Sequence, residues 1–300
     1  MVTNASPDTQ SSAPVLATIA GIALFSAMDA AMKDAALAVG AYSAYLLRCL
    51  IGALLTMPVW WIHTRRLPSR EVMRIHLRRG VVLAFMGWSF FAALTRLPLA
   101  EAIAISFIAP LIALYLAAVL LGETIQPRAI IGAILGLTGV LVIVGGRVGE
   151  GAFDEEAIFG VALVLGSAIL FALNLILQRQ QALLASPIEA SAFQNGIVTL
   201  VLVVGAPFLL ELPEGGRGWL PIGIGALLSI SASMLLTWAY ARSETQRLVP
   251  VEYTGFLWAS LFGWLLFGEP VGLAALLGAA LIVAGCLLAT RRKRTGQTAV

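Results

Sequence analysis

The sequence predicts an all-α integral membrane protein with ten transmembrane helices. Hydrophobic residues make up 60% of the 300 residues and charged residues only 12%, whereas a soluble domain carries about 25% charged residues. Apolar runs long enough to cross a hydrocarbon core, about 20 residues of helix, recur ten times. Helices are expected because each span must satisfy its own backbone hydrogen bonds in lipid. The predicted spans are 15–36, 42–62, 79–95, 100–121, 128–146, 158–178, 188–211, 220–241, 248–267 and 271–290.

The segments outside the spans are short, and their charges predict the orientation. The longest loops are 63–79, which is rich in arginine, and 147–157, which is acidic. The N-terminal tail, MVTNASPDTQSSAP, lacks the basic start of a secretory signal peptide, so the first span is expected to be retained. Most Lys and Arg residues of the loops and tails, including Arg79 in the 63–79 loop, fall on the side of both termini. The positive-inside rule therefore predicts that both termini are cytoplasmic.

The chain matches itself when it is shifted by 146 residues. Each half, 1–146 and 158–300, carries five predicted spans, and 147–157 is expected to be an external linker. Because five is odd, the second half must enter the membrane from the opposite side, so the repeat is inverted. Such repeats are characteristic of secondary transporters, which hold the substrate near the bilayer midplane and work by alternating access. The matched pairs include Phe107 with Tyr253, Glu123 with Glu269, Gly132 with Gly278 and Gly139 with Gly285.

The segments 93–144 and 239–289, which end their fourth and ninth spans with LLGE and LLFGEP, resemble the EamA repeat. That repeat defines ten-helix members of the drug/metabolite transporter superfamily. The resemblance implies a bacterial inner-membrane exporter of small metabolites. Amino acids, aromatic or otherwise apolar, are the favoured class, because the chain most resembles exporters of aromatic amino acids. A drug or other metabolite exporter of the same fold and a non-transporting scaffold or sensor are the alternatives. The family pattern also implies a cavity lined by the first, third and fourth helices of each half.

Charged side chains inside the spans are candidates for coupling or gating, because charges are costly in lipid. Asp29 and Lys33 lie four residues apart in the first span, a spacing that favours an ion pair on one helix face. Asp29 could instead carry a proton or meet the amino group of a substrate. Glu252 lies near the start of the ninth span, where the helix dipole favours a carboxylate, and a gating or coupling role is the alternative. Arg48, inside the second span, is expected to be structural, with a carboxylate or backbone carbonyls as its partner.

Candidate substrate-binding residues lie in the spans that the family pattern places around the cavity. Pro110 removes a hydrogen-bond donor from its helix, and such interruptions often mark transporter sites. Several aromatic side chains would suit an apolar or aromatic substrate, and Asn174 would hold the substrate's polar end. For each aromatic residue, packing against lipid or another helix is the alternative. The candidates are Ser26, Trp88, Phe107, Pro110, Phe171, Asn174 and Tyr253.

Glu123 and Glu269 each follow a glycine at the end of a matching span. We expect both to be structural helix ends, whose carboxylates accept hydrogen bonds from the amides that open the following helix. The motif Gly132-x-x-x-Gly136 predicts close approach between helices, with a homodimer as one way to use it.

No catalytic residue, cofactor or metal site is expected. The two histidines, His63 and His76, lie in one predicted loop, and the chain has neither an HExxH nor a P-loop motif. Cys49 and Cys286 lie inside apolar runs and are expected to be small buried hydrophobic residues. No stretch combines basic residues with exposed aromatic ones, so nucleic acid is not expected as a partner. The expected partners are a small-molecule substrate and the lipid bilayer.

Overall fold

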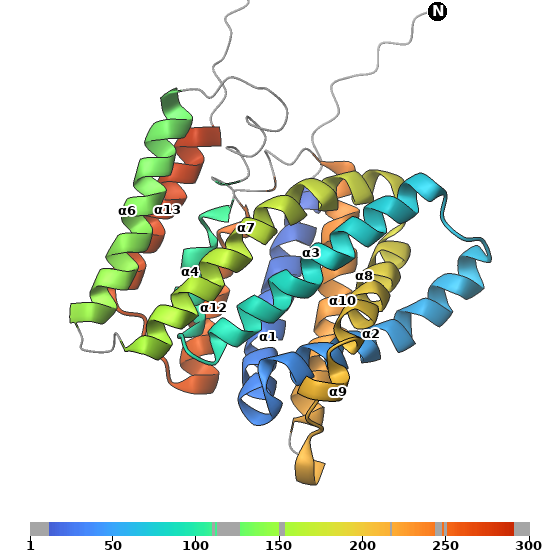
Figure 1. Cartoon of the computed structure of the whole chain (residues 1–300). Coiled ribbons are helices and arrows are strands. Elements are labelled where there is room, and N and C mark those ends of the chain that lie inside the picture. The colour runs from blue at the N-terminus through green and yellow to red at the C-terminus, as the bar shows by residue number, and fades with distance from the viewer. Residues whose placement is uncertain are drawn as a thin grey trace, which may run out of the picture.

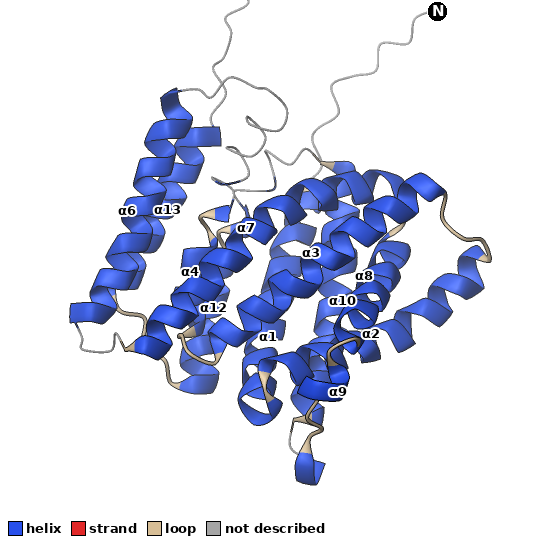
Figure 2. Ribbon diagram, in the orientation of Figure 1, coloured by secondary structure: helices blue, strands red, loops and turns tan. Residues whose placement is uncertain are grey.

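The computed structural model describes residues 12–109, 112, 127–149, 154–216, 218–243, 248 and 251–290. Within these ranges the chain is helical and contains no strand (Figure 2), so the all-helical prediction is confirmed. The helices are α1 (Ala13–Val39), α2 (Ala41–Thr64), α3 (Arg70–Leu94), α4 (Leu99–Ser106), α6 (Pro127–Gly149), α7 (Glu155–Leu184), α8 (Pro187–Val203), α9 (Ala206–Leu209), α10 (Trp219–Arg242), α12 (Gly255–Phe267) and α13 (Leu273–Thr290), with a 3-10 turn, η1, at Glu214–Gly216.

Five of the described helices are long and apolar enough to cross a membrane, namely α1, α2, α3, α7 and α10. Shorter apolar stretches lie in α6, α8, α12 and α13. The fourth predicted span, 100–121, begins with α4, but most of its second half lies outside the described residues. Within the described residues, apolar helices therefore lie at nine of the predicted spans, and the total of ten stays a prediction.

Two predicted boundaries are wrong. The third span does not begin at residue 79, because α3 starts nine residues earlier, at Arg70. The hydroxyl of Ser69 caps this helix by accepting a hydrogen bond from the amide of Val72, at 3.3 Å. The seventh span is not one continuous helix either. It breaks after α8, and α9 begins anew with a proline in its first turn, where a missing amide N–H is tolerated.

The helices pack in pairs across the molecule (Figure 1). The most extensive contacts join α6 with α13, α1 with α10, α3 with α7, and α2 with α8, and α4 makes a smaller contact with α12. Glycine allows the close approach of α6 to α13. A Cβ atom on Gly278 would lie 2.5 Å from the carbonyl oxygen of Gly139, and one on Gly285 would lie 2.5 Å from that of Gly132. Small residues at such crossings let backbones approach closely in a membrane, so the glycine-rich face of α6 is used against α13 within the chain.

Helix α4 ends and helix α12 begins at positions that match across the two halves. Residues Phe107 and Ile108 form a turn after α4, and Tyr253 and Thr254, 146 residues later, form a turn before α12. Phe107 and Thr254 donate their amides three residues back, to Ala104 at 3.2 Å and to Val251 at 3.0 Å. Both turns adjoin the same cavity. Interrupted helices at a substrate cavity are a recurrent feature of transporters.

Candidate functional site

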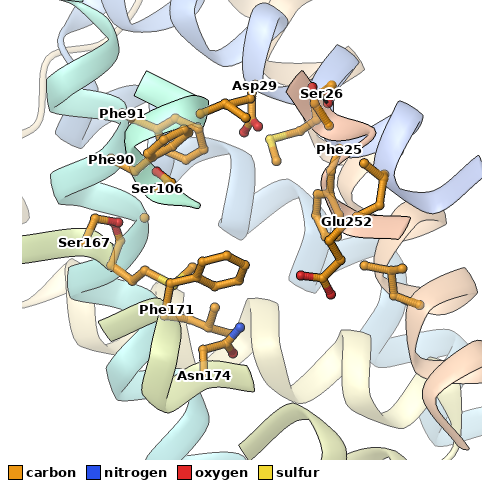
Figure 3. A pocket seen from close by; sticks show the side chains of 18 of the residues that line it. Phe25, Ser26, Asp29, Phe90, Phe91, Ser106, Ser167, Phe171, Asn174 and Glu252 are labelled. Atoms are coloured by element: carbon orange, nitrogen blue, oxygen red, sulfur yellow. Dashed lines mark hydrogen bonds between the residues drawn. The ribbon is translucent and has the colours of Figure 1, made fainter. Parts of the chain in front are cut away.

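A cavity of about 230 Å³ lies between the two halves of the chain (Figure 3). Helices α1, α3 and α4 line it from the first half, and α7, α10 and the segment before α12 line it from the second. Single residues or pairs from α2 and α8 complete the wall. The cavity thus receives side chains from the helices that the family resemblance implies, and from two more.

Aromatic side chains form much of the cavity wall, as large apolar groups commonly do in small-molecule sites. The rings of Phe107 and Tyr253 meet edge to face, with centroids 5.1 Å apart and planes at 83°. These two residues are matched across the halves, so the repeat brings equivalent positions into contact. The other aromatic lining residues include Phe25, Tyr45, Phe90, Phe91 and Phe171.

Two carboxylates point into this cavity from different helices. Asp29 lies on α1, and Glu252 lies in the segment before α12, pointing toward the part of α7 that carries Phe171 and Asn174 (Figure 3). The hydroxyl of Tyr240, on α10, donates a hydrogen bond to Oε1 of Glu252. These negative charges, set among aromatic rings in the cavity wall, are suited to a cationic group of a solute.

Arg48 lines the cavity beside Asp29, and its partners differ from those expected. Its Nη1 donates to Oγ of Ser229 at 2.7 Å, and its Nη2 donates to Sγ of the buried Cys49 at 3.1 Å. Its guanidinium carbon lies 4.9 Å from the ring centroid of Tyr45, a cation–π distance. The expected backbone carbonyls are not its hydrogen-bond partners in the described residues, where a hydroxyl, a thiol and an aromatic face contact the guanidinium, and the Asp29 carboxylate acts on it through its charge and not through a hydrogen bond. The side chain of Cys286 lies outside the described part of the structure.

Arg79 is the second guanidinium on the cavity wall, and its placement corrects the sequence analysis. It was assigned to a cytoplasmic loop, but it lies two turns into α3 and is 6% exposed. Its Nε donates to Oδ1 of Asn174 at 3.0 Å, its Nη2 to Oε1 of Gln178 at 3.3 Å, and its Nη1 to Oε1 of Gln181. Three amides on one face of α7 therefore orient the guanidinium.

Beyond Arg79, the polar contacts continue between α3, α7 and α8. Nε2 of Gln181 lies 2.7 Å from Nδ1 of His76, and the other ring nitrogen of His76 lies 3.1 Å from Oε1 of Glu189. The imidazole stacks on Phe193 at 4.5 Å. His76 is thus a buried histidine in α3, not a loop residue. In the described residues, no three His, Cys, Asp or Glu side chains gather in a way that could hold a metal ion.

Lys33 and Glu269 lie away from the cavity and form an ion pair with each other. Lys33 also donates to the carbonyl oxygen of Leu97 at 2.8 Å, and Oε2 of Glu269 accepts from the amide of Leu99 at 2.8 Å. The expected pairing of Lys33 with Asp29 is wrong, because this tertiary partner takes the ammonium group. The prediction that Glu269 binds amides of the following helix is also wrong, because its carboxylate caps α4 instead.

The structure brings most of the predicted site residues together. Trp88 is an exception: it is 36% exposed and packs edge-on against Tyr42 outside the cavity. Gly87, the residue before Trp88, lines the cavity. Because successive residues of an α-helix are rotated by about 100° around its axis, the side chain of Trp88 points in another direction. Pro110 and Glu123 lie outside the described residues. The predicted residues that line the cavity are Ser26, Asp29, Phe107, Phe171, Asn174, Glu252 and Tyr253.

Sequence reasoning named Asn174 as a substrate contact but missed its role in holding Arg79, and it missed Gln178 and Gln181 altogether. A signal for them was present, because Asn174, Gln178 and Gln181 follow the spacing i, i+4, i+7 on α7. A polar stripe on one face of an otherwise apolar helix indicates a buried polar partner. The cavity residues Ser106, Ser167 and Gln194 carry no comparable pattern.

Comparison with known proteins identifies the relatives of this chain. The sequence model of the EamA-like transporter family matches residues 12–145 and 158–291. The pseudopaline exporter CntI of Pseudomonas aeruginosa strain UCBPP-PA14 is 27% identical over 289 residues, which cover 96% of this chain and 99% of CntI. The aromatic amino acid exporter YddG of Ancylobacter novellus is 27% identical over 207 residues, covering 67% of this chain and 70% of YddG.

A solved crystal structure shares the fold. It superposes with a TM-score of 0.62 at 23% sequence identity, covering 93% of this chain and 96% of the other. At this identity the likeness speaks for the fold alone. The relatives that match nearly the whole chain are transporters, not enzymes.

Proposed function

We propose that this chain, which belongs to the EamA-like transporter family, is a secondary transporter that exports a small metabolite by alternating access. Membership of the family makes it a multi-pass membrane protein of a transporter type. The observation that carries the finer proposal is the central cavity, whose wall combines aromatic rings with two carboxylates and two guanidinium groups from both halves. Amino acids with aromatic or other apolar side chains fit such a wall, with the rings around the side chain and the charged groups near the polar end.

The packing of the helices supports the inverted repeat on which alternating access depends. Exchanging the halves turns the pair α1 with α10 into the pair α7 with α3, and both pairs are observed. The same exchange turns the contact of Gly139 with Gly278 into that of Gly285 with Gly132. In both contacts, a Cβ atom added to the glycine of α13 would lie 2.5 Å from the carbonyl oxygen of the glycine of α6. The exchange leaves three other pairs unchanged, because each joins equivalent helices of the two halves: α2 with α8, α4 with α12, and α6 with α13. We infer two five-helix repeats with both termini on the cytoplasmic side.

The relatives support export more strongly than they support one substrate. One is named as an exporter of pseudopaline and another as an exporter of aromatic amino acids. An exporter of a drug or another metabolite, and a non-transporting scaffold or sensor, are the alternatives to test against.

Counterflow in proteoliposomes tests the proposal. Vesicles loaded with an unlabelled amino acid should accumulate the same labelled amino acid from outside when they contain the protein, and protein-free vesicles should not. We expect accumulation with phenylalanine, tyrosine or tryptophan. If drugs or other metabolites exchange and amino acids do not, the substrate class is wrong. If folded protein exchanges none of these solutes, the transporter proposal itself is contradicted.

Asp29 and Glu252 are the carboxylates that we assign to energy coupling if protons drive the transport, with uncoupled facilitated diffusion as the alternative. Both line the cavity, where a change of protonation would be felt by a solute. With Asp29→Asn, we expect an imposed pH gradient to drive at least 10-fold less uphill accumulation, while counterflow continues. With Glu252→Gln, we expect a similar loss together with slower counterflow, because this carboxylate also faces the cationic group of the solute. Asp34→Asn, on the exposed face of the same helix as Asp29, is the matched control. Unchanged pH-driven accumulation in both cavity variants would exclude these residues as proton carriers.

A further inference from the structure

Arg79 is a buried cation that has no carboxylate partner among the described residues. All three of its hydrogen-bond acceptors are neutral amide oxygens, those of Asn174, Gln178 and Gln181. The ion pairs found in the described ranges are Lys33 with Glu269, His76 with Glu189, and Arg96 with Glu156. A charge at membrane depth is costly, and it normally pairs with an opposite charge or serves a function. We therefore look for a group outside these residues that could supply the negative charge opposite Arg79.

The guanidinium is held in a way that leaves donors for a ligand. Arginine carries five N–H donors in a rigid planar fork, and the three observed bonds use one on each of its nitrogens. The side chain is buried between helices but lines the cavity, so a solute held there faces it. A planar fork matches the two oxygens of a carboxylate, with which arginine forms bidentate hydrogen bonds.

Arg48 is less suited to this task, although it also lines the cavity. Its two terminal nitrogens already donate to Ser229, to Cys49 and to Sδ of Met28, whereas its Nε is buried and makes no hydrogen bond to the described residues. Its guanidinium carbon lies 4.9 Å from the ring centroid of Tyr45 and 6.0 Å from that of Phe91. It also shares its part of the cavity with Asp29, a nearby negative charge.

We propose that Arg79, oriented by Asn174, Gln178 and Gln181, binds the carboxylate of the transported solute. This inference rests on the proposed function and narrows its substrate class to molecules that carry a carboxylate. Glu252 points toward the same part of α7 and supplies the opposite charge (Figure 3). The cavity thereby recognises a zwitterion by its two ends, while the aromatic wall contacts its apolar side chain. An apolar cation without a carboxylate would leave Arg79 uncompensated.

Binding of matched solutes to the purified full-length protein tests this assignment. The probes are L-phenylalanine and phenethylamine, which lacks only the carboxylate. We expect the wild type to bind phenylalanine about 10-fold to 100-fold more tightly, the range for a charge-assisted hydrogen-bonded contact. Arg79→Gln should weaken phenylalanine binding by a similar factor and change phenethylamine binding less than about 2-fold. Arg78→Gln removes the same charge from the neighbouring exposed position and should change neither.

A second variant keeps Arg79 and the shape of its surroundings. Asn174→Asp places a carboxylate 3.0 Å from Nε of Arg79, where the amide oxygen now lies. This internal counter-charge should compete with the carboxylate of the solute, so phenylalanine binding should weaken while the melting temperature stays equal or rises. Arg79→Lys keeps the charge without the fork and should restore part of the affinity lost in Arg79→Gln.

Three results would overturn the assignment. One is wild-type affinity for phenylalanine in both Arg79→Gln and Asn174→Asp. Another is an equal loss of phenylalanine and phenethylamine binding in folded Arg79→Gln. The third is a wild type that binds phenethylamine as tightly as phenylalanine, or binds neither. Counterflow separates these failures from that of the proposed function, because a wild type that still exchanges amines or other solutes remains a transporter.

Discussion

Replacing Ser106 with tryptophan is expected to reduce transport to less than a tenth of the wild-type rate. Ser106 lies on the last turn of α4 and faces the cavity (Figure 3). An indole at this position would fill much of a cavity of about 230 Å³ that the solute must occupy. The initial rate of counterflow in proteoliposomes measures the effect.

Ser231→Trp is the matched control for the obstruction of the cavity by Ser106→Trp. The hydroxyl of Ser106 donates to the carbonyl oxygen of Ala102 at 2.9 Å, and that of Ser231 donates to Leu227 at 3.0 Å, in each case four residues back. Both substitutions therefore remove the same kind of local bond, but Ser231 is exposed on α10. Ser231→Trp should transport at the wild-type rate. Wild-type transport by folded Ser106→Trp would show that the solute takes another route.

Replacing Lys33 with methionine is expected to destabilise the protein by about 3 kcal/mol, the usual cost of removing one partner from a buried ion pair. The side chain of Lys33 is 7% exposed and that of Glu269 is 20% exposed. Without the ammonium group, the Glu269 carboxylate keeps the amide of Leu99 as a partner but loses its counter-charge. The melting temperature of the purified protein in detergent measures the change.

Two further variants separate the contribution of the Lys33–Glu269 ion pair from a general effect of charge on stability. Asp34→Asn changes a charge at the exposed neighbouring position and should leave the melting temperature unchanged. The double variant Lys33→Met with Glu269→Gln should recover part of the loss, because no uncompensated charge then stays behind. A Lys33→Met protein as stable as the wild type would mean that the ion pair contributes nothing to the fold.

The sequence was sufficient for features that depend on composition and on the repeat. The apolar runs predicted the helices, and the offset of 146 residues matched Phe107 with Tyr253, whose rings meet at 5.1 Å. The same offset matched glycines at which the backbones of α6 and α13 come close together. These predictions succeed because a repeated sequence folds into repeated elements, so equivalent residues occupy equivalent places.

The errors share a physical cause, which is that spacing along one helix does not reveal what faces it. Asp29 and Lys33 have the spacing of an ion pair, but Glu269, distant in sequence, neutralises Lys33. Trp88 lies in α3 next to the cavity residue Gly87, but its side chain packs against Tyr42 outside the cavity. The sequence suggested that Arg79 is a charged loop residue, whereas in the structure three amide side chains of α7 accept its hydrogen bonds. Each case is decided by the rotation of a helix and by its neighbours, which only the tertiary structure gives.

The most direct test of alternating access measures from which sides of the membrane the cavity can be reached. A Ser106→Cys variant, with Cys49 and Cys286 replaced by alanine, places one thiol on the cavity wall. A membrane-impermeant thiol reagent is then added from either side of oriented vesicles. A cavity that opens to each side in turn will be labelled from both sides, and a transported solute will slow the labelling. Labelling from one side alone, at a rate that no transported solute changes, would contradict the account.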